Sequence, residues 1–315
     1  MKKKAIIISL NGFYLTTREK ILLRKERPWG IILFKRNIRS IKQVKKLTYN
    51  IRHILKDSQY PILIDEEGGN VSRLSKIIDN KIFSQKLFGD IYSKDKKISI
   101  SLYKNYILSI NSILKEMGIN INTIPVLDML HTNTHQIIGN RSYSKKKEII
   151  KKLGQICVNA NKKDKILSVV KHIPGHGRAK SDSHFKLPII KETYKNLISS
   201  DFECFMNINS HFVMTAHILY KKIDKFNCAT HSKKIIKEII RKKIKFKGII
   251  ISDDISMKAL KYNLVQNAIK SLEAGCNIVL YCAGKTSQSE KLLGKIPNID
   301  KFTQKKTSEF YKFLS

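Results

Sequence analysis

Acidic residues are scarce in this sequence of 315 residues, and their scarcity limits the partners that its surface suits. Lysine and arginine total 61, against 25 aspartates and glutamates, which gives a formal net charge of +36. Such a charge suits nucleic acid or an anionic membrane. The basic residues are spread along the whole chain, whereas a binding footprint more often occupies one face or one tail. Lysine, isoleucine and asparagine, whose codons are rich in A and T, are abundant together. We therefore expect compositional drift rather than dedicated nucleic-acid binding.

Cysteines are few and show no pairing pattern. The five are Cys157, Cys204, Cys228, Cys276 and Cys282; their number is odd, they are scattered, and no CxxC pair occurs. This pattern indicates reduced thiols in a cytoplasmic protein rather than a disulfide framework or a structural zinc site.

Long apolar runs are also lacking, so the sequence predicts no membrane span. The lysines at 2–4, followed by the apolar run Ala5–Leu10, resemble the start of a signal peptide. The run is short, however, Asn11 interrupts it, and no small-residue cleavage site follows. We interpret it as a first buried strand behind a solvated charge cluster, and we expect a cytoplasmic protein.

Short apolar runs do recur, and they alternate with longer segments of helical pattern. Because the runs are almost continuously apolar, they suit strands that are buried on both faces of a parallel sheet. No linker rich in proline, glycine or serine divides the chain, so we expect a single domain over residues 1–315. The predicted strands are Ala5–Leu10, Gly30–Phe34, Pro61–Asp65, Asn122–Leu127, Ile166–Val170, Phe212–Ala216, Gly248–Ser252 and Asn277–Tyr281.

The segments between these strands carry signals for helix ends. Thr16–Glu19 and Ser40–Gln43 have capping-box spacing, and Asn263 resembles another helix start. Gly118 and Gly275 stand where a left-handed residue would end a helix. The long gap between the third and fourth strands has room for two helices. Eight strands with helical crossovers favour an α/β fold of the (β/α)8 TIM-barrel type over an open doubly wound sheet.

Polar residues cluster where the predicted strands end. Barrel enzymes place their chemistry at these carboxyl ends, so the clustering predicts an active site on this face. The residues concerned are Asp65, Glu66 and Glu67 after the third strand, Asp128 after the fourth, Lys171 and His172 after the fifth, His217 after the sixth, and Asp253 and Asp254 after the seventh.

Two pairs among the polar residues have catalytic potential. Successive strand residues point in opposite directions, so one of Asp253 and Asp254 should face the barrel mouth, while the other caps a helix beginning near Ser256. Spacing alone does not say which. In the loop after the fifth strand, Asp182 and His184 are one residue apart. A carboxylate bonded to one ring nitrogen raises the basicity of the other, so this pair suits an acid/base role, although a solvated turn is the simpler interpretation.

A metal-dependent hydrolase is a second enzyme class that fits these residues. His172, His176, His217 and Asp253 at strand ends have the chemistry of metal ligands. No HxH pair occurs on a strand, however, and the positive side chains Lys171, Arg73 and Arg141 would disfavour a cation at the same mouth.

Taken together, the motifs resemble those of the β-N-acetylhexosaminidases of glycoside hydrolase family 3, of the NagZ type. The similarity covers nearly the whole chain, and the motifs follow in one order, each near a predicted strand end. They are GIILFKRNI at 30–38, LIDEEGGNVSRL at 63–74, INTIPVLDM at 121–129, GNRSY at 139–143, KHIPGHGRAKSDSH at 171–184, MTAHI at 214–218, GIIISDDISMKAL at 248–260 and AGCNIVLYC at 274–282. The chain departs from the family pattern at Asn70, Arg178 and His231.

The resemblance implies roles that spacing could not assign. It makes Asp253 the nucleophile and His184 the acid/base, supported by Asp182, in a retaining mechanism. It implies no metal or organic cofactor. It also implies a muropeptide substrate, from which N-acetylglucosamine is released during cytoplasmic peptidoglycan recycling. The implied sugar contacts are Asp65, Arg73, Arg141, Lys171 and His172.

Two further expectations concern partners and alternatives. We expect a monomer that binds a small carbohydrate. The alternative to an enzyme is a catalytically decayed basic barrel that binds polyanions, for which steep salt dependence would be diagnostic.

Overall fold

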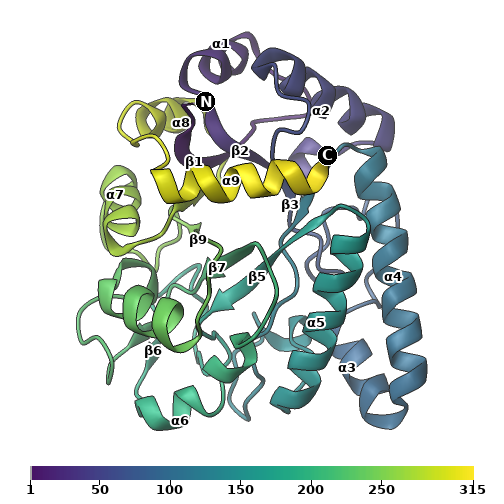
Figure 1. The fold of residues 1–315 in the computed structure, drawn as a ribbon, viewed down its shortest axis with the longest axis vertical. Helices are drawn as coiled ribbons and strands as arrows, with labels where there is room; N and C mark the ends of the chain where they lie inside the picture. Colours follow the sequence, from purple (N-terminus) through teal and green to yellow (C-terminus); the bar gives the residue numbers. More distant parts are fainter. Residues whose placement is uncertain (1) are drawn as a thin grey trace.

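The predicted strands close into a barrel in the computed structural model, which describes residues 2–315 (Figure 1). Each strand pairs in parallel with both neighbours, and β1 pairs with β10 to complete the ring. The prediction of a (β/α)8 barrel is therefore confirmed. In order around the barrel, the strands are β1 (Lys4–Ser9), β2 (Pro28–Leu33), β3 (Ile62–Ile64), β4 (Ile121–Asn122), β5 (Leu167–Ile173), β7 (Phe212–Thr215), β9 (Ile249–Asp254) and β10 (Ile278–Tyr281).

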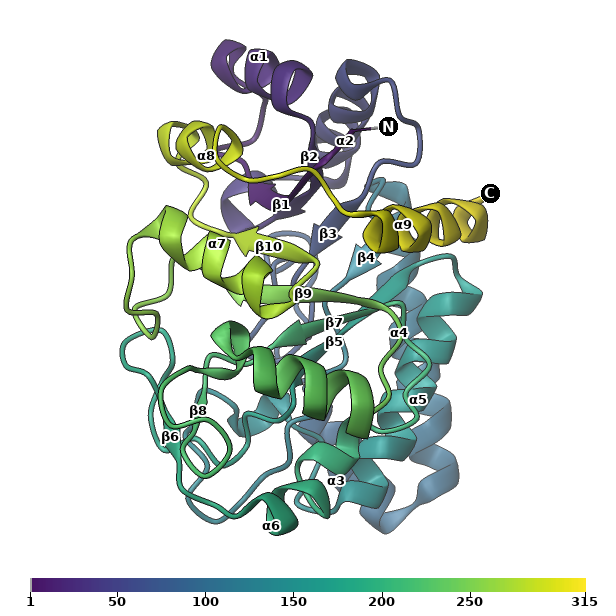
Figure 2. The same ribbon diagram turned by 60° about the vertical axis from the view of Figure 1, so that its left-hand side comes forward.

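Helices surround the barrel, and α9, the yellow helix, runs to the carboxyl end of the chain (Figure 2). Two helices fill the long gap between β3 and β4, as the sequence predicts. A small sheet of β6 (Ile189–Ile190) and β8 (Leu219–Tyr220) extends the loops after β5 and β7. The helices are α1 (Thr17–Glu26), α2 (Ile41–Leu55), α3 (Gln85–Lys94), α4 (Lys96–Glu116), α5 (Lys147–Lys163), α6 (Tyr194–Ile198), the π-helix η5 (Ile235–Lys243), α7 (Leu264–Ala274), α8 (Thr286–Leu293) and α9 (Lys301–Leu314).

Local signals in the sequence set several helix ends. Thr16 and Glu19 form the expected capping box of α1, with each side chain bonded to the other's backbone. Ser40 caps α2 through the amide of Gln43, but the Gln43 side chain accepts from Arg39 instead. Asn263 caps α7, and Gly275 ends it in a left-handed conformation. These contacts fix where each helix leaves the sheet and so position the strand ends.

Helix α9 closes the amino-terminal end of the barrel. Phe310 packs against Trp29 at the start of β2 and Phe212 at the start of β7. The Trp29 indole donates to Thr307 at 2.9 Å. This plug leaves the carboxyl ends of the strands as the open face.

Two local predictions were wrong. Strand β4 ends at Asn122 rather than at Leu127, because the Asn122 side chain pairs with the backbone of Glu66 and replaces the next rungs of the ladder. No helix begins near Ser256: residues 255–260 form turns, in which the Asp254 carboxylate accepts from the Ser256 amide and hydroxyl.

Within residues 2–315, no helix is both long enough and apolar enough to cross a bilayer.

Candidate active site

A cavity of about 240 Å³ opens at the carboxyl ends of the strands. It brings together seven of the eight predicted site residues, and the eighth, Asp182, supports it from behind His184. The lining residues are Asp65, Val71, Arg73, Ile137, Ile138, Arg141, Lys171, His172, His176, Ser183, His184, Met214, Asp253, Met257, Leu280 and Cys282.

The structure distinguishes the two aspartates at the end of β9. Asp253 faces the cavity, while Asp254 turns away and accepts from Ser256 and from the Cys282 amide. Burial alone would raise the pKa of the Asp253 carboxyl, but nearby His217, His172 and Lys171 outweigh it and hold that pKa below its usual range. Asp253 is therefore ionised at neutral pH, as a nucleophile requires.

Asp65 is held between two cations on the opposite side of the cavity. Its carboxylate accepts from Lys171 Nζ at 2.8 Å, from Arg73 Nη2 at 2.8 Å and from the Thr123 hydroxyl. Burial opposes ionisation, but Lys171 and Arg73 keep the pKa of Asp65 well below its usual range. An ionised carboxylate flanked by donors suits the hydroxyl groups of a sugar, which both accept and donate hydrogen bonds.

A second ion-paired cluster adjoins the first. Arg141 clamps Glu67 with two bonds of 2.8 and 2.9 Å, and Lys171 lies 2.6 Å from the same carboxylate. Arg141 Nη2 also lies 3.4 Å from His172 Nε2, while His172 Nδ1 lies 2.7 Å from Asp128. With Asp128 on Nδ1, the arrangement turns Nε2 toward the cavity and toward Arg141.

The loop that carries His184 is held by hydrogen bonds within the loop and by bonds to residues outside it. Asp182 Oδ1 lies 2.7 Å from His184 Nδ1 and accepts from the His184 amide at 2.8 Å. Ser183, between them, is buried, and its hydroxyl lies 3.2 Å from His176 Nε2. The His176 amide in turn donates to Asp128 at 2.6 Å. The exposed acid/base candidate is thus held from below by a buried histidine and serine.

Sequence reasoning missed four of these supporting residues. Glu67 and Asp128 stood out only as polar residues at strand ends, and Thr123 and Ser183 not at all. The EEGG run and the serine inside the DSH motif were the available signals. Neither signal indicates a partner, because Glu67 bonds to Arg141, 74 residues away, and Ser183 contacts His176 across an irregular loop.

The buried His176 predicts a dependence of stability on pH. Burial, and then the charge of His172, lower the pKa of His176 to about 4. Between pH 6.5 and 4, His176 therefore binds a proton in the unfolded chain but not in the folded protein, so acidification favours unfolding. The stability lost over this window is up to about 3 kcal/mol. Denaturant titrations should show a shallower loss in His176→Gln than in the wild type.

The exposed His53 on α2 provides the control for that comparison. His53→Gln also removes one imidazole, but from the exposed surface of α2. Any effect that comes only from losing an imidazole should therefore appear in both variants. Equal slopes in the wild type and His176→Gln would contradict the assignment.

Gly177 provides a test of the loop's attachment. A Cβ at this position would lie 1.7 Å from the carbonyl oxygen of Met129, so the backbone of the loop must move. We expect Gly177→Ala to lose about 1–3 kcal/mol of stability, as overpacking does, and to lower kcat/KM by displacing His184. Thermal unfolding and glycosidase assays measure both. Gly12→Ala is the matched control, because nothing lies within 4 Å of its Cβ; equal behaviour of the two variants would refute this view of the loop.

The residues proposed as metal ligands have other partners. Within residues 2–315, no three His, Cys, Asp or Glu side chains form a group that could hold a metal ion. His217 Nδ1 lies 2.7 Å from Thr230 Oγ1, and its Nε2 lies 3.0 Å from the Asp254 carbonyl. The rings of His172 and His176 are engaged by Asp128 and Ser183. These partners fix the rings for hydrogen bonding rather than for a shared cation.

Two of the departures from the family pattern have a structural explanation. Arg178 Nε donates to Asp201 at 2.7 Å, and Nη1 lies 3.4 Å from Glu192, so this residue anchors the base of the acid/base loop. His231 bonds to the carbonyl of Asn267 at 3.2 Å and does not line the cavity.

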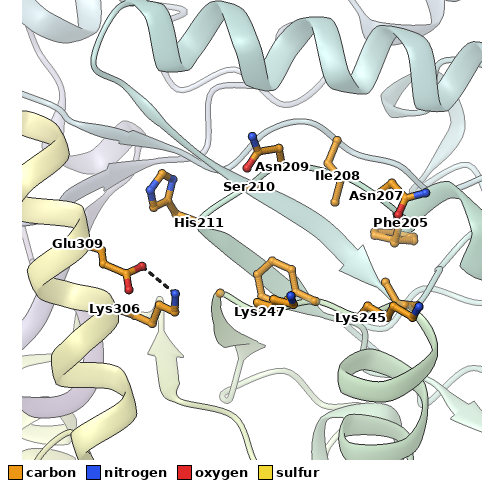
Figure 3. A pocket seen from close by; sticks show the side chains of 13 residues that line it. Phe205, Asn207, Ile208, Asn209, Ser210, His211, Lys245, Lys247, Lys306 and Glu309 are labelled. Carbon is orange, nitrogen blue, oxygen red and sulfur yellow. Dashed lines mark hydrogen bonds and ion pairs between the residues drawn. The ribbon is translucent and has the colours of Figure 1, made fainter.

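A cavity of about 310 Å³ lies at the other end of the barrel, between the starts of β7 and β9 and helix α9 (Figure 3). His211, Lys245 and Lys247 contribute to its lining, and its acidic residue, Glu309, is bonded to Lys306 at 2.7 Å. The residues predicted as nucleophile and acid/base, Asp253 and His184, line the cavity at the carboxyl ends and not this one.

Comparison with known proteins identifies the family. Residues 9–309 match the glycosyl hydrolase family 3 N terminal domain. The chain belongs to glycoside hydrolase family 3. This confirms the family that the motifs indicated, and it makes the protein a glycoside hydrolase.

Relatives of this family 3 member share both its sequence and its shape. A β-hexosaminidase of Haemophilus influenzae is 32% identical over 286 residues, which span 88% of this chain and 79% of that protein. A β-hexosaminidase of Nitrosomonas eutropha is 29% identical over 292 residues, or 91% and 83%. NagZ from Neisseria gonorrhoeae, solved in complex with N-trifluoroacetyl-D-glucosamine, superposes with a TM-score of 0.89 at 29% identity, covering 100% of this chain and 90% of that one.

Proposed function

We propose that this glycoside hydrolase is a retaining β-N-acetylhexosaminidase that releases terminal β-linked N-acetylglucosamine from muropeptides. One observation carries the proposal: Asp253, kept ionised, and His184, held by Asp182, line the same cavity as the ion-paired cluster around Asp65. The names of the β-hexosaminidase relatives and the sugar bound in the gonococcal structure support this substrate class.

The first step forms a covalent glycosyl-enzyme. An Asp253 oxygen attacks the anomeric carbon, and the bond from that carbon to the leaving oxygen breaks. His184 gives its proton to the leaving oxygen, because Asp182 occupies Nδ1 and leaves Nε2 as the exchanging atom. Most retaining enzymes use a second carboxyl group for this role. An imidazole can take its place, because its unperturbed pKa of about 6.5 is near a neutral working pH.

The second step returns the enzyme to its starting state. His184, now neutral, takes a proton from water as the water oxygen attacks the anomeric carbon. The bond to Asp253 breaks, and the sugar leaves with its original anomeric configuration. Because His184 is exposed on a loop, closure of that loop over the sugar would exclude bulk water from the intermediate.

The cluster opposite Asp253 orients the sugar ring. Asp65 accepts from sugar hydroxyls, while Lys171 and Arg73, which already bond to Asp65, hold it in place and donate to other hydroxyls. Arg141 provides donors on the adjoining wall, where His172 Nε2 lies beside it. No step in this scheme requires a metal or an organic cofactor.

The cellular role forms part of the same proposal. We place the protein in cytoplasmic peptidoglycan recycling, acting as a monomer with residues 1–315 as one catalytic domain.

An aryl β-N-acetylglucosaminide assay tests the function directly. The purified protein should release the phenol, and activity should persist in EDTA, whereas a metal-dependent hydrolase would lose it. Proton NMR should show the β-anomer as the first sugar product, since two inversions retain configuration. A folded wild-type protein that is inactive on both an aryl glycoside and a muropeptide would contradict the proposal and favour the polyanion-binding barrel.

A further inference from the structure

An aromatic side chain stands exposed beside the acid/base candidate. Phe185 directly follows His184, and 72% of its surface is accessible to solvent. Its amide donates to the Asp182 carbonyl at 3.1 Å, so the residue that holds His184 also fixes the start of Phe185. An exposed aromatic face at the edge of a cavity gains free energy when a ligand covers it.

Lys258, which follows the strand that carries Asp253, contacts the Phe185 ring. Lys258 lies in the turn after β9, next to Met257, which lines the cavity. Its Nζ lies 5.8 Å from the centre of the Phe185 ring, within the range of a cation–π contact. Within residues 2–315, no carboxylate forms an ion pair with Lys258. The ammonium is therefore available to a bound anion.

The chemistry of the reaction places the leaving group on this side. His184 must reach the oxygen that joins the two parts of the substrate, so the leaving group extends past His184 toward the cavity edge. The Asp65 cluster occupies the opposite wall and suits the sugar that stays. Phe185 and Lys258 directly follow the lining residues His184 and Met257 and contact each other, so both adjoin the path of a leaving group that extends past His184.

We propose that Phe185 and Lys258 form the leaving-group side of the site and select a leaving group that combines a flat apolar face with a carboxylate. The inference rests on the proposed glycosidase function and adds the two residues that discriminate between its substrates. Phe185 packs against a sugar or aromatic ring, and Lys258 binds the carboxylate from the ring's edge.

A pair of synthetic substrates isolates the charge contribution. The 4-(carboxymethyl)phenyl and 4-(carbamoylmethyl)phenyl β-N-acetylglucosaminides differ in charge, while the methylene keeps the acidity of the two phenols similar. Lys258→Gln should lower kcat/KM for the carboxylate about three- to fivefold, mainly through KM, and leave the amide within about twofold, as expected for an exposed ion pair. Lys258→Arg should restore the preference, and added salt should reduce it in the wild type.

Phe185→Ala tests the apolar contribution. It should raise KM for both substrates about fivefold with little change in kcat, since the lost contact is made in the ground state and transition state alike. A loss confined to kcat would mean that Phe185 only positions His184, and would overturn its part of the proposal.

Lys261→Gln is the matched control, because Lys261 is exposed in the same segment, whereas the cation–π contact with Phe185 is made by Lys258. An equal carboxylate-to-amide ratio in Lys258→Gln and Lys261→Gln would overturn the role of Lys258, even if the enzyme hydrolyses both substrates. A wild-type protein that hydrolyses neither substrate would instead refute the proposed function, and this inference with it.

Discussion

Asp253→Ala should abolish turnover of aryl β-N-acetylglucosaminides, with kcat falling by roughly four to six orders of magnitude, as when other covalent nucleophiles are removed. The carboxylate faces the cavity and is ionised, and no other carboxylate among the lining side chains is free of a paired cation: Asp65 is held by Lys171 and Arg73. Initial-rate assays on the folded variant measure the loss.

Two controls, azide rescue of Asp253→Ala and the variant Asp254→Asn, distinguish a chemical role of Asp253 from a structural one. Azide fits the space left by the Asp253 carboxylate and should restore turnover of an activated substrate, giving the α-glycosyl azide by a single inversion. Asp254→Asn, which alters a carboxylate that bonds to Ser256 and Cys282, should lose no more than about tenfold, since only a supporting hydrogen bond is weakened. If Asp254→Asn were the more damaging change, the assignment of the nucleophile would be wrong.

His184→Ala should lower kcat/KM by about 10²- to 10⁴-fold for substrates with poor leaving groups, the range typical of general acid–base catalysis. The loss should shrink for dinitrophenyl glycosides, whose phenolate leaves without a proton. Rates across a series of phenols measure this dependence, and it should be much steeper in the variant than in the wild type.

Asp182→Asn provides the graded comparison for His184. The amide keeps the shape of the side chain but not its charge, so the ring loses the partner that sets its tautomer. We expect a smaller loss than in His184→Ala, with the same dependence on the leaving group. A uniform loss for good and poor leaving groups would show that the loop only binds the sugar.

The sequence predicts the barrel well because its signals are local. Each strand is an apolar run, and caps such as Thr16 and Asn263 depend on contacts three residues away. The prediction failed at the end of β4, where the Asn122 side chain takes over pairing from the backbone, and near Ser256, where the Asp254 carboxylate stabilises a turn instead of a helix. In both places one polar side chain outweighs the pattern of its neighbours.

The candidate site also contains residues that the sequence predicted and residues that it did not. Its prominent residues were predicted from strand ends and from the family resemblance, and they do gather around one cavity. Strand alternation left the choice between Asp253 and Asp254 open; the family resemblance pointed to Asp253, and Asp253 is the one that lines the cavity. Ser183 contacts His176, seven residues earlier in the same loop, and Glu67 bonds to Arg141, 74 residues away, so neither contact follows a recognised local pattern.

The pairing of β1 with β10 and the plug made by α9 have a consequence for how the protein is made. Ile6 of the first strand pairs opposite Val279 of the last, and Trp29 is covered by Phe310. During synthesis on the ribosome, the edge of β1 therefore stays uncovered until β10 has emerged, and the apolar end of the barrel stays uncovered until α9 has emerged. Contacts between such distant parts of a chain slow folding and expose surfaces that promote aggregation. A nascent chain that stalls before α9 would leave the side chains of Trp29 and Phe212 without the cover of Phe310.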